Sequence, residues 1–270
     1  MVKKKKKRKH ADGKRKQPAG MLTRVRQWLR IGGNSTTTWL EGQDHNHWDE
    51  VGRAQYDYLV CHGLKPSHTL LDLPCGSFRA GRFLIDYLDS GKYFGVDASQ
   101  KAVDSGRERV LEPKGLLQKT PTIKVSRLTE QHQDFGALLG CRAFDYVWVH
   151  ALFDHIPHDV IRTSLLDMAD VVKPGGRIFA TIFLNPHGPE FREPMIRPRH
   201  GSIQDGVVTF PDREYWHHTV DFFRDCIRGH PTLRLDGCFF DYEHPLGLRM
   251  LRFTRVEQGR DDDAGRSPIP

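Results

Sequence analysis

Short apolar runs that predict β-strands alternate with stretches of helical periodicity along most of this 270-residue chain. The strand-like runs are 69–73, 93–96, 122–125, 145–149 and 177–183. The helix-like stretches between them are 79–88, 100–111 and 160–172. Strands that alternate with helices indicate right-handed βαβ units. We therefore predict an α/β fold with a mainly parallel sheet that is covered on both faces.

The end of this pattern differs from the rest. After a helix-like stretch at 221–228, two strand-like segments, 233–242 and 250–255, follow closely and are expected to pair as an antiparallel terminal hairpin. A turn is expected at Pro174-Gly175-Gly176, ahead of the fifth strand. The predicted architecture is a Rossmann-like sheet of about seven strands, mostly parallel, with an antiparallel terminal pair.

The positive charge of the chain is concentrated at its N-terminus. The net charge is +7, and residues 1–20 contribute +9, so the other 250 residues carry −2. Like charges at the density of Lys3 to Lys9 repel one another, so we predict a disordered basic tail over 1–20. It is either simply solvated or a weak tether to an anionic partner such as nucleic acid, an acidic surface or anionic lipid.

We predict one domain over 21–256, followed by a loose tail at 257–270. Residues 21–65 are expected to form an N-terminal helical cap, which includes an amphipathic segment at 21–31. The Pro-, Gly- and charge-rich stretch 184–218 is expected to be an insert that covers the active site, with a hairpin around Asp205-Gly206.

Apolar residues make up 38% of the chain, which is enough for a packed core. No apolar run approaches the ~18 residues that span a bilayer, and no secretory signal is evident. The five cysteines, Cys61, Cys75, Cys141, Cys226 and Cys238, form no C-x-x-C pair. An odd, scattered set is typical of reduced thiols, so we expect a cytoplasmic protein without a transmembrane segment.

The first strand-to-helix junction, Leu70 to Arg82, is the candidate ligand site. Ligands of open α/β sheets bind outside the carboxyl ends of the strands, and Asp97 follows Asp72 by 25 residues at the end of the second strand. The loop holds only Gly76 and Gly81, without G-x-G-x-x-G or Lys-Ser/Thr, so it offers no phosphate cradle. Taken singly, Asp72 and Gly76 also suit a cap and a turn, and Asp97 also suits a helix N-cap.

Four segments together resemble the motifs of class I S-adenosylmethionine (SAM) dependent methyltransferases. They are LLDLPCGSFRAGRFL, YFGVDAS, FDYVWVHALFDHIP and VVKPGGRIFATIF, in that order along the chain. The terminal HPLGLRMLRFTR resembles a bacterial subgroup of this superfamily with small-molecule-type members of unknown substrate. The similarity covers roughly 48–255, and the order of the four motifs is more specific than any one of them. It implies the class I methyltransferase fold and SAM as the cofactor.

The resemblance also implies roles for individual residues. Asp72 and the backbone at Cys75 and Gly76 would hold the amino-acid end of SAM. Asp97 would bind the ribose hydroxyls, and Ala98 would lie against the adenine. The adenine amino group would contact either Glu130 or Asp134-Phe135. His150 and Ala151 would face the methyl-donor region, while Pro74 and Phe78 replace two glycines of the motif, and Phe78 is expected to narrow the loop.

Methyl transfer requires a general base only when the acceptor must lose a proton. His155, shortly after the fourth strand, is the predicted catalytic base, and His150 is its competitor. Asp154 is expected to orient a partner or to cap the helix that begins near Pro157. The alternative for His155 is a structural loop residue bonded to backbone.

Two His-rich segments are candidates for further sites. His45-Asn46-His47 with Asp49 and Glu50 has ligand types that suit zinc, but no second His/Cys pair lies at ligand spacing, so no metal is predicted and an aromatic lid is the alternative. Tyr215-Trp216-His217-His218 lines the acceptor pocket or is a polar loop.

The sequence therefore predicts a SAM-dependent methyltransferase that acts on a small-molecule or glycan-type acceptor. The near-neutral charge outside 1–20 and the insert at 184–218 favour this class of acceptor. One alternative is an RNA or protein methyltransferase that uses the basic tail. Another is a non-catalytic nucleotide-binding or regulatory module.

Overall fold

The computed structural model describes residues 45–128, 131–184, 202–204, 207–210, 215–242 and 248–257. Within these ranges, the side chains of 45–47, 202–204, 207–210 and 215–216 are not described. The chain divides into two compact units, 1–35 and 36–270, and every described residue belongs to the second. The predictions for the tail at 1–20, the amphipathic segment 21–31 and the end at 258–270 therefore lie outside the described residues.

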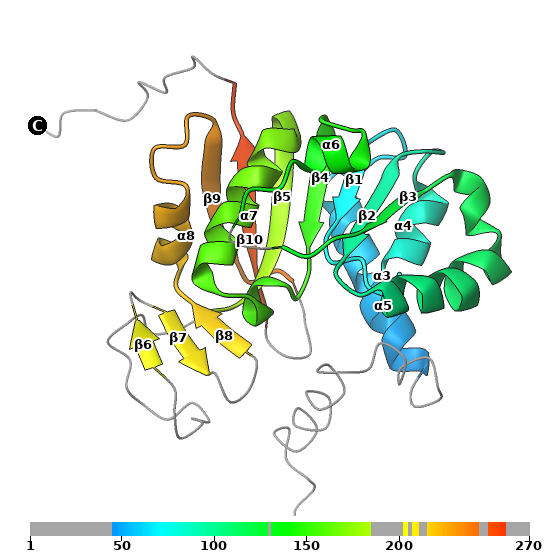
Figure 1. Ribbon diagram of the computed structural model, residues 1–270, viewed down its shortest axis with the longest axis horizontal. Helices are drawn as coiled ribbons and strands as arrows, with labels where there is room; N and C mark the ends of the chain where they lie inside the picture. Colours follow the sequence, from blue (N-terminus) through cyan, green and yellow to red (C-terminus); the bar gives the residue numbers. More distant parts are fainter. Residues whose placement is uncertain are drawn as a thin grey trace, which may run out of the picture. The chain divides into compact units, whose positions relative to one another are not determined.

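The central sheet of this unit has the strand order β3-β2-β1-β4-β5-β10-β9 (Figure 1). The strands are β1 (Leu70–Asp72), β2 (Tyr93–Asp97), β3 (Thr122–Val125), β4 (Phe144–Val149), β5 (Val172–Leu184), β9 (Leu233–Phe239) and β10 (Arg249–Arg255). The first five pair in parallel, whereas β10 is antiparallel to both β5 and β9. The predicted Rossmann-like sheet with an antiparallel terminal pair is confirmed.

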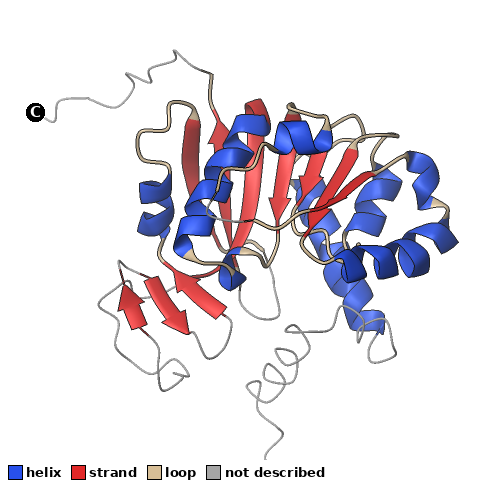
Figure 2. Ribbon diagram, viewed as in Figure 1, coloured by secondary structure: helices blue, strands red, loops and turns tan. Residues whose placement is uncertain are grey.

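Helices cover both faces of this sheet (Figure 2). On one face lie α3 (His45–Cys61), α4 (Gly81–Tyr87) and α5 (Gln100–Gly106), and on the other α6 (Phe135–Leu139), α7 (His158–Val171) and α8 (Val220–Cys226). Neighbouring residues of each strand enter opposite cores, so Leu70 packs with the first set and Leu71 with the second. No described helix combines the length and apolar character needed to cross a membrane.

Three further strands extend from the carboxyl end of β5. They are β6 (Ser202–Gln204), β7 (Val207–Phe210) and β8 (Tyr215–His218). β6 and β7 pair antiparallel around residues 205–206, which confirms the predicted hairpin pairing. β8 pairs with β7 and, in parallel, with the last two residues of β5. The stretch 215–218 is therefore a strand, and the interpretation as a polar loop is wrong.

The predicted turn at Pro174-Gly175-Gly176 lies inside β5, so that prediction is also wrong. Gly175 has φ +78°, and the pairing register between β4 and β5 shifts next to it. A Cβ on Gly176 would lie 2.9 Å from the carbonyl oxygen of Phe144, so the close approach of β4 requires glycine. The Pro-Gly-Gly run marks an irregularity in a strand rather than its beginning.

Candidate active site

The loop that follows β1 is bonded to both strands that flank β1. The backbone N–H of Leu73 donates to the carbonyl of Trp148 on β4 at 2.9 Å, and that of Cys75 donates to the carbonyl of Val96 on β2 at 3.0 Å. Gly76 has φ +54°, and a Cβ placed on it would meet no atom within 4 Å. Open space beside a glycine lets a ligand approach the backbone of this loop closely.

Asp97, at the end of β2, is hydrogen-bonded to this loop. Its Oδ2 accepts a hydrogen bond from the Gly76 N–H, and its Oδ1 accepts one from the Ser99 N–H, both at 2.8 Å. Burial raises the pKa of Asp97, and these backbone donors oppose the shift. Helix α5 is capped by Ser99, whose Oγ accepts from the Ala102 N–H, so Asp97 is not the N-cap. Ala98 is exposed beside it.

Asp72 is buried at the end of β1, with 3% of its surface exposed. Its Oδ2 accepts a hydrogen bond from the Tyr93 hydroxyl at 2.6 Å, so it caps no helix. Burial raises the pKa of Asp72 to about 7. Burial, together with the nearby Asp72 and Asp97, also raises the pKa of the Cys75 thiol. The structure thus gathers Asp72, Cys75, Gly76 and Asp97 at one edge of the sheet.

Phe78 stands where the resembled motif has a glycine, but its ring does not fill the space beside Gly76. Its φ is +64°, an unusual conformation for a residue with a side chain. The ring is fully buried in the core between the sheet and α4 and α5. Gly106 of α5 packs against this turn, because a Cβ there would lie 2.6 Å from the Ser77 Cα. The expected narrowing of the loop by Phe78 is therefore wrong.

His150 follows β4 and is buried, with 6% exposed. Its ring stacks on Trp148 at 5.8 Å and meets Tyr242 edge-on at the same distance. Ala151 has φ +52°, and its N–H donates to the Thr181 Oγ1 at 2.8 Å. Tyr242 has no sequence signal that links it to His150, because it lies more than 90 residues further along the chain in an irregular segment after β9.

In the turn after His150, Asp154 is buried and hydrogen-bonded, whereas the neighbouring His155 is exposed. Asp154 is 1% exposed, and its Oδ1 accepts from the Phe183 N–H at 2.8 Å, which ties the turn to the end of β5. Burial raises the pKa of Asp154 to about 8. Helix α7 begins after Pro157 without a side-chain cap, so Asp154 does not cap it. His155 is exposed beside it, and its role as the base stays a prediction.

The two candidates for the adenine contact have structural partners here. Asp134 caps α6 through the Ala137 N–H and also pairs with Arg142. The Phe135 ring is fully buried in the core. Glu130, the other candidate, lies outside the described residues, and the adenine contact stays a prediction.

The histidines of β8 are buried beside the same turn. His218 Nε2 donates to the carbonyl of Phe153 at 3.0 Å, and burial lowers the pKa of His218 to about 3. Burial lowers the pKa of His217 to about 4, so both rings are neutral at pH 7. The described residues include no group of three or more His, Cys, Asp or Glu placed to hold a metal ion. The side chains of His45 and His47 lie outside the description.

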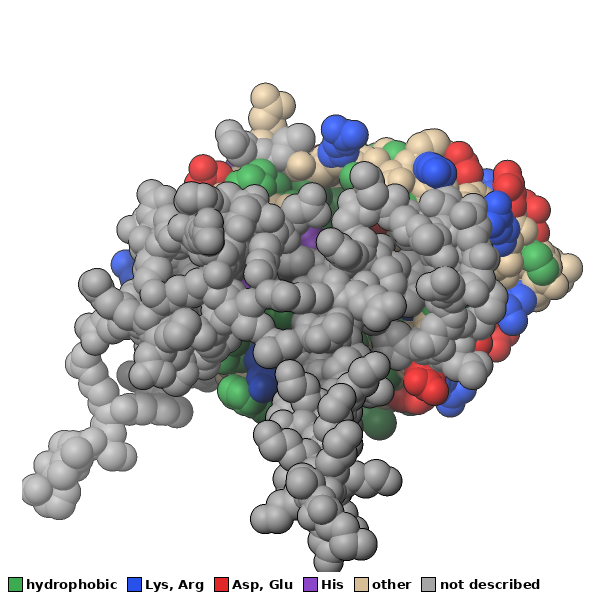
Figure 3. All heavy atoms as spheres, turned by 90° about the horizontal axis from the view of Figure 1, so that it is seen from below, with side chains coloured by type: hydrophobic (Ala, Val, Ile, Leu, Met, Phe, Trp, Pro, Cys, Tyr) green, Lys and Arg blue, Asp and Glu red, His purple; other side chains and the backbone are tan. Residues whose placement is uncertain are grey.

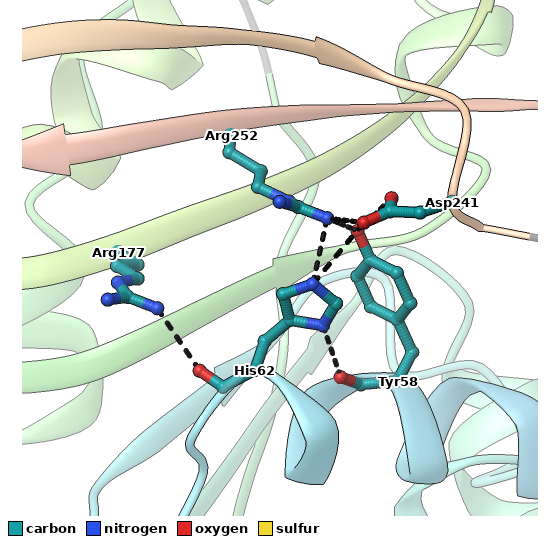
Figure 4. A network of polar contacts seen from close by, with 5 residues as sticks. All are labelled: Tyr58, His62, Arg177, Asp241 and Arg252. Carbon is teal, nitrogen blue, oxygen red and sulfur yellow. Dashed lines mark hydrogen bonds and ion pairs between the residues drawn. The ribbon is translucent and has the colours of Figure 1, made fainter.

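A polar cluster, called here the Tyr58 network (Tyr58, His62, Arg177, Asp241 and Arg252), joins α3 to the antiparallel end of the sheet (Figure 4). The Tyr58 hydroxyl accepts from Arg252 at 2.6 Å and donates to Asp241 at 3.0 Å. Arg252 also pairs with Asp241, and Arg177 of β5 donates to the His62 carbonyl. Since Asp241 precedes Tyr242, this network anchors the segment that meets His150.

The comparisons with known proteins agree with this geometry. Residues 71–178 match a protein family described as a methyltransferase domain. Magnesium protoporphyrin IX methyltransferase from Synechocystis PCC 6803, solved with bound SAM, shares 17% identity at a TM-score of 0.53 and covers 90% of this chain and 100% of its own. A glycopeptide N-methyltransferase in complex with S-adenosyl-L-homocysteine (SAH) shares 14% identity at a TM-score of 0.54, covering 76% and 90%.

A TehB-like SAM-dependent methyltransferase from Corynebacterium glutamicum is also similar, with 13% identity and a TM-score of 0.51 over 88% of this chain and 100% of its own. At these identities the solved structures establish the shared fold. The family match covers the part of the chain that carries the loop and Asp97. Together they confirm the predicted enzyme class, a methyltransferase. The predicted cofactor, SAM, is the one bound in the Synechocystis enzyme. The subgroup and the acceptor stay predictions.

Proposed function

We propose that this methyltransferase transfers a methyl group from SAM to a small-molecule or glycan-type acceptor. The observation that carries the cofactor site is the hydrogen bond between Asp97, at the end of β2, and the Gly76 N–H in the loop that follows the buried Asp72 at the end of β1. In this proposal Asp97 binds the ribose hydroxyls and Ala98 lies against the adenine. Asp72, Cys75 and Gly76 hold the amino-acid end, and His150 faces the methyl donor.

When bound, SAM supplies a methyl group on a positively charged sulfur, which is already activated for displacement. The protein therefore needs mainly to hold the acceptor in line and to exclude water. His150 stacks on Trp148, and both rings meet Tyr242 edge-on, so the three form a packed, buried aromatic cluster at the proposed methyl-donor site. His155 would accept a proton from a hydroxyl acceptor, because histidine is the side chain best suited to act as a general base near neutral pH.

The charge distribution supports a small acceptor. Outside residues 1–20 the chain carries −2. At the end of the molecule formed by α5, basic and acidic side chains are interspersed and no large patch of one sign is visible there (Figure 3). Proteins that grip nucleic acid usually gather Lys and Arg on a folded face. A glycopeptide methyltransferase with the same fold is consistent with this class of acceptor.

Binding of SAH to the Asp97→Ala variant tests the cofactor site. Loss of hydrogen bonds to a charged group costs roughly 1.5–3 kcal/mol each, so we expect SAH affinity to fall by at least about tenfold in calorimetric titration. Asp104→Ala, which removes an exposed carboxylate of α5 bonded only to Gln100, should bind SAH like the parent. Equal SAH affinity in Asp97→Ala and the parent would mean that the ribose contact is assigned wrongly.

The acceptor class is tested separately, with labelled SAM and pooled metabolite, glycan and RNA fractions. We expect label in the metabolite or glycan pool, with a rate that falls in Asp97→Ala. The run Lys3 to Lys9 favours a second candidate, an RNA or protein methyltransferase that uses the basic tail for delivery. Label confined to the RNA pool or to protein would support this second candidate instead.

A further inference from the structure

The proposed base, His155, ends a single 3₁₀ turn that begins at Phe153, and the two residues before it are held by buried contacts. The Asp154 carboxyl group accepts from the Phe183 N–H at 2.8 Å, which joins the turn to the end of β5. The Phe153 ring is fully buried and packs on Phe223 of α8, with ring centres 5.6 Å apart. His155 itself is exposed. The position of His155 therefore depends on the contacts of its two neighbours.

A third contact to this turn comes from β8, at the end of the insert. His218 Nε2 donates to the Phe153 carbonyl at 3.0 Å, so the ring carries its proton on Nε2. The ring is fully buried and stacks on Phe222, with ring centres 5.5 Å apart. Because β8 pairs in parallel with the last two residues of β5, His218 lies beside the strand end that also holds Asp154. The end of the insert is thus bonded directly to the turn that carries His155.

Stability alone does not explain a histidine at position 218. Among the described residues, its Nδ1 is buried and has no hydrogen-bond partner. An unpaired buried polar atom destabilises a fold. Leucine has a similar volume and would pack against Phe222 and Phe223 without this cost. The interaction that leucine could not replace is the hydrogen bond to the Phe153 carbonyl.

We propose that His218 is a positioning residue, which holds the turn so that His155 can take the proton of the acceptor. This rests on the proposed function, in which His155 is the base for a hydroxyl acceptor. In that reaction the acceptor oxygen forms a bond to the methyl carbon as the bond from sulfur to that carbon breaks, and the hydroxyl proton passes to His155. A catalytic group displaced by about 1 Å can cost roughly a hundredfold in rate. His218 would act on the reaction only through the turn.

The test measures transfer of label from SAM into the metabolite or glycan fraction that the parent labels. His218→Leu removes the donor, so we expect turnover at saturating SAM to fall by roughly tenfold to a hundredfold, while SAH affinity in calorimetric titration changes by less than about twofold. His218→Gln, whose amide can donate to the Phe153 carbonyl, should retain most of the turnover.

His230→Leu is a matched control. His230 Nδ1 accepts from the Leu233 N–H at 3.0 Å, at the beginning of β9 and so at the opposite edge of the sheet from the candidate site. This variant also removes a hydrogen bond between a histidine ring and the backbone, but it should turn over like the parent.

A double variant separates positioning from a merely structural role. His155→Gln removes the proposed base and should lower turnover. Adding His218→Leu to it should lower turnover by less than about threefold further, because both changes affect the same step. Losses that multiply in full, unchanged turnover in His218→Leu, or SAH affinity that falls in proportion to turnover would overturn the proposal. Turnover like the parent's in His155→Gln would instead show that the base of the proposed function, on which this proposal rests, is assigned wrongly.

One measurement requires no variant. In ¹H–¹⁵N spectra of the histidine rings of the full chain, His218 should carry its proton on Nε2 and should not titrate between about pH 5 and 8. A proton on Nδ1 would mean that the ring does not donate to the Phe153 carbonyl. That result, or a ring that titrates within this range, would contradict the proposal even if the variants fail to fold.

Discussion

Three aspartates near the site, Asp72, Asp97 and Asp154, share an effect of burial. The pKa of each is raised, to about 7 for Asp72 and about 8 for Asp154, because burial disfavours the charged carboxylate. In the unfolded chain each would titrate near its ordinary value of ~3.9. The folded protein therefore binds more protons than the unfolded chain between these values. Stability should fall as pH rises through that window.

Asp154→Asn tests this expectation. The protonated Asp154 stabilises the fold below about pH 4, and this contribution is lost as pH rises toward 8. The asparagine oxygen can still accept from Phe183 but cannot ionise. We expect the unfolding free energy of the parent to fall more than that of the variant between pH 5 and 8, by roughly 1–3 kcal/mol, since one pKa unit corresponds to about 1.4 kcal/mol. Urea unfolding at both pH values measures this, and parallel changes in the two proteins would contradict it.

Among individual residues, the sequence predicts the site residues that end strands. It does not predict those that tertiary contacts bring to the site from distant parts of the chain. Asp72 and Asp97 were predicted because they end neighbouring parallel strands, whose carboxyl ends must share one edge of the sheet. Tyr242 was not, because its neighbour Asp241 is held by Tyr58 of the distant helix α3. This tertiary contact has no local sequence pattern.

At the scale of elements, the loop depends on how closely α5 approaches it. A Cβ on Gly106 would lie 2.6 Å from the Ser77 Cα and 2.7 Å from the Phe78 ring. Gly106→Ala should therefore displace α5 or the loop, at a cost of about 1–3 kcal/mol for overpacking, partly offset by ~1 kcal/mol of helix propensity. We expect a lower midpoint of urea unfolding and weaker SAH binding. Lys101→Ala, an exposed position on the same helix, is the control and should change neither property. Unaltered SAH affinity in Gly106→Ala would show that the loop tolerates this displacement.

The Tyr58 network is the second contact between elements that can be tested. Tyr58→Phe removes the hydroxyl that accepts from Arg252 and donates to Asp241. We expect a loss of about 1.5–3 kcal/mol of unfolding free energy, the value of hydrogen bonds to charged groups. Tyr56→Phe on the same helix is a matched control, because within the described residues the Tyr56 hydroxyl has no hydrogen bond. Equal stability of the two variants would mean that the network contributes nothing measurable.

The helices and strands that the sequence predicted are those in which apolar residues recur with a clear period. The elements that it missed lack such a period. The five parallel strands and α7 were placed within a few residues, because buried strands and amphipathic helices repeat regularly. Helix α6 spans only Phe135–Leu139, too short for a periodic signal. The strand β8 was missed because Tyr215 to His218 pairs with the distant end of β5. Pro-Gly-Gly was misread because a bulge inside a strand uses the same residues as a turn.

In the whole chain, the candidate cofactor site and the concentration of positive charge lie in different parts of the sequence. The candidate cofactor site lies where β1 and β4, adjacent in the sheet, lead away in opposite directions along it. The positive charge lies at the N-terminus, where residues 1–20 carry +9 against −2 for the remainder. Since the candidate cofactor residues all belong to the part of the chain that carries −2, we expect cofactor binding to be independent of the tail. An anionic partner is the ligand that a basic tail would bind.

Deletion of residues 1–20 separates the two acceptor classes. If the acceptor is a small molecule or glycan, the truncated chain should keep the parent's SAH affinity and its rate within about twofold, with little dependence on salt, because an uncharged acceptor offers a basic tail no anionic partner. If the acceptor is RNA, each phosphate contact made by the tail lowers affinity as salt rises, with a slope of about −0.7 per contact for a single strand. Rates measured from 50 to 300 mM salt for both proteins give the answer. A steep salt dependence in the parent that disappears on truncation would contradict the small-molecule proposal while leaving the SAM site intact.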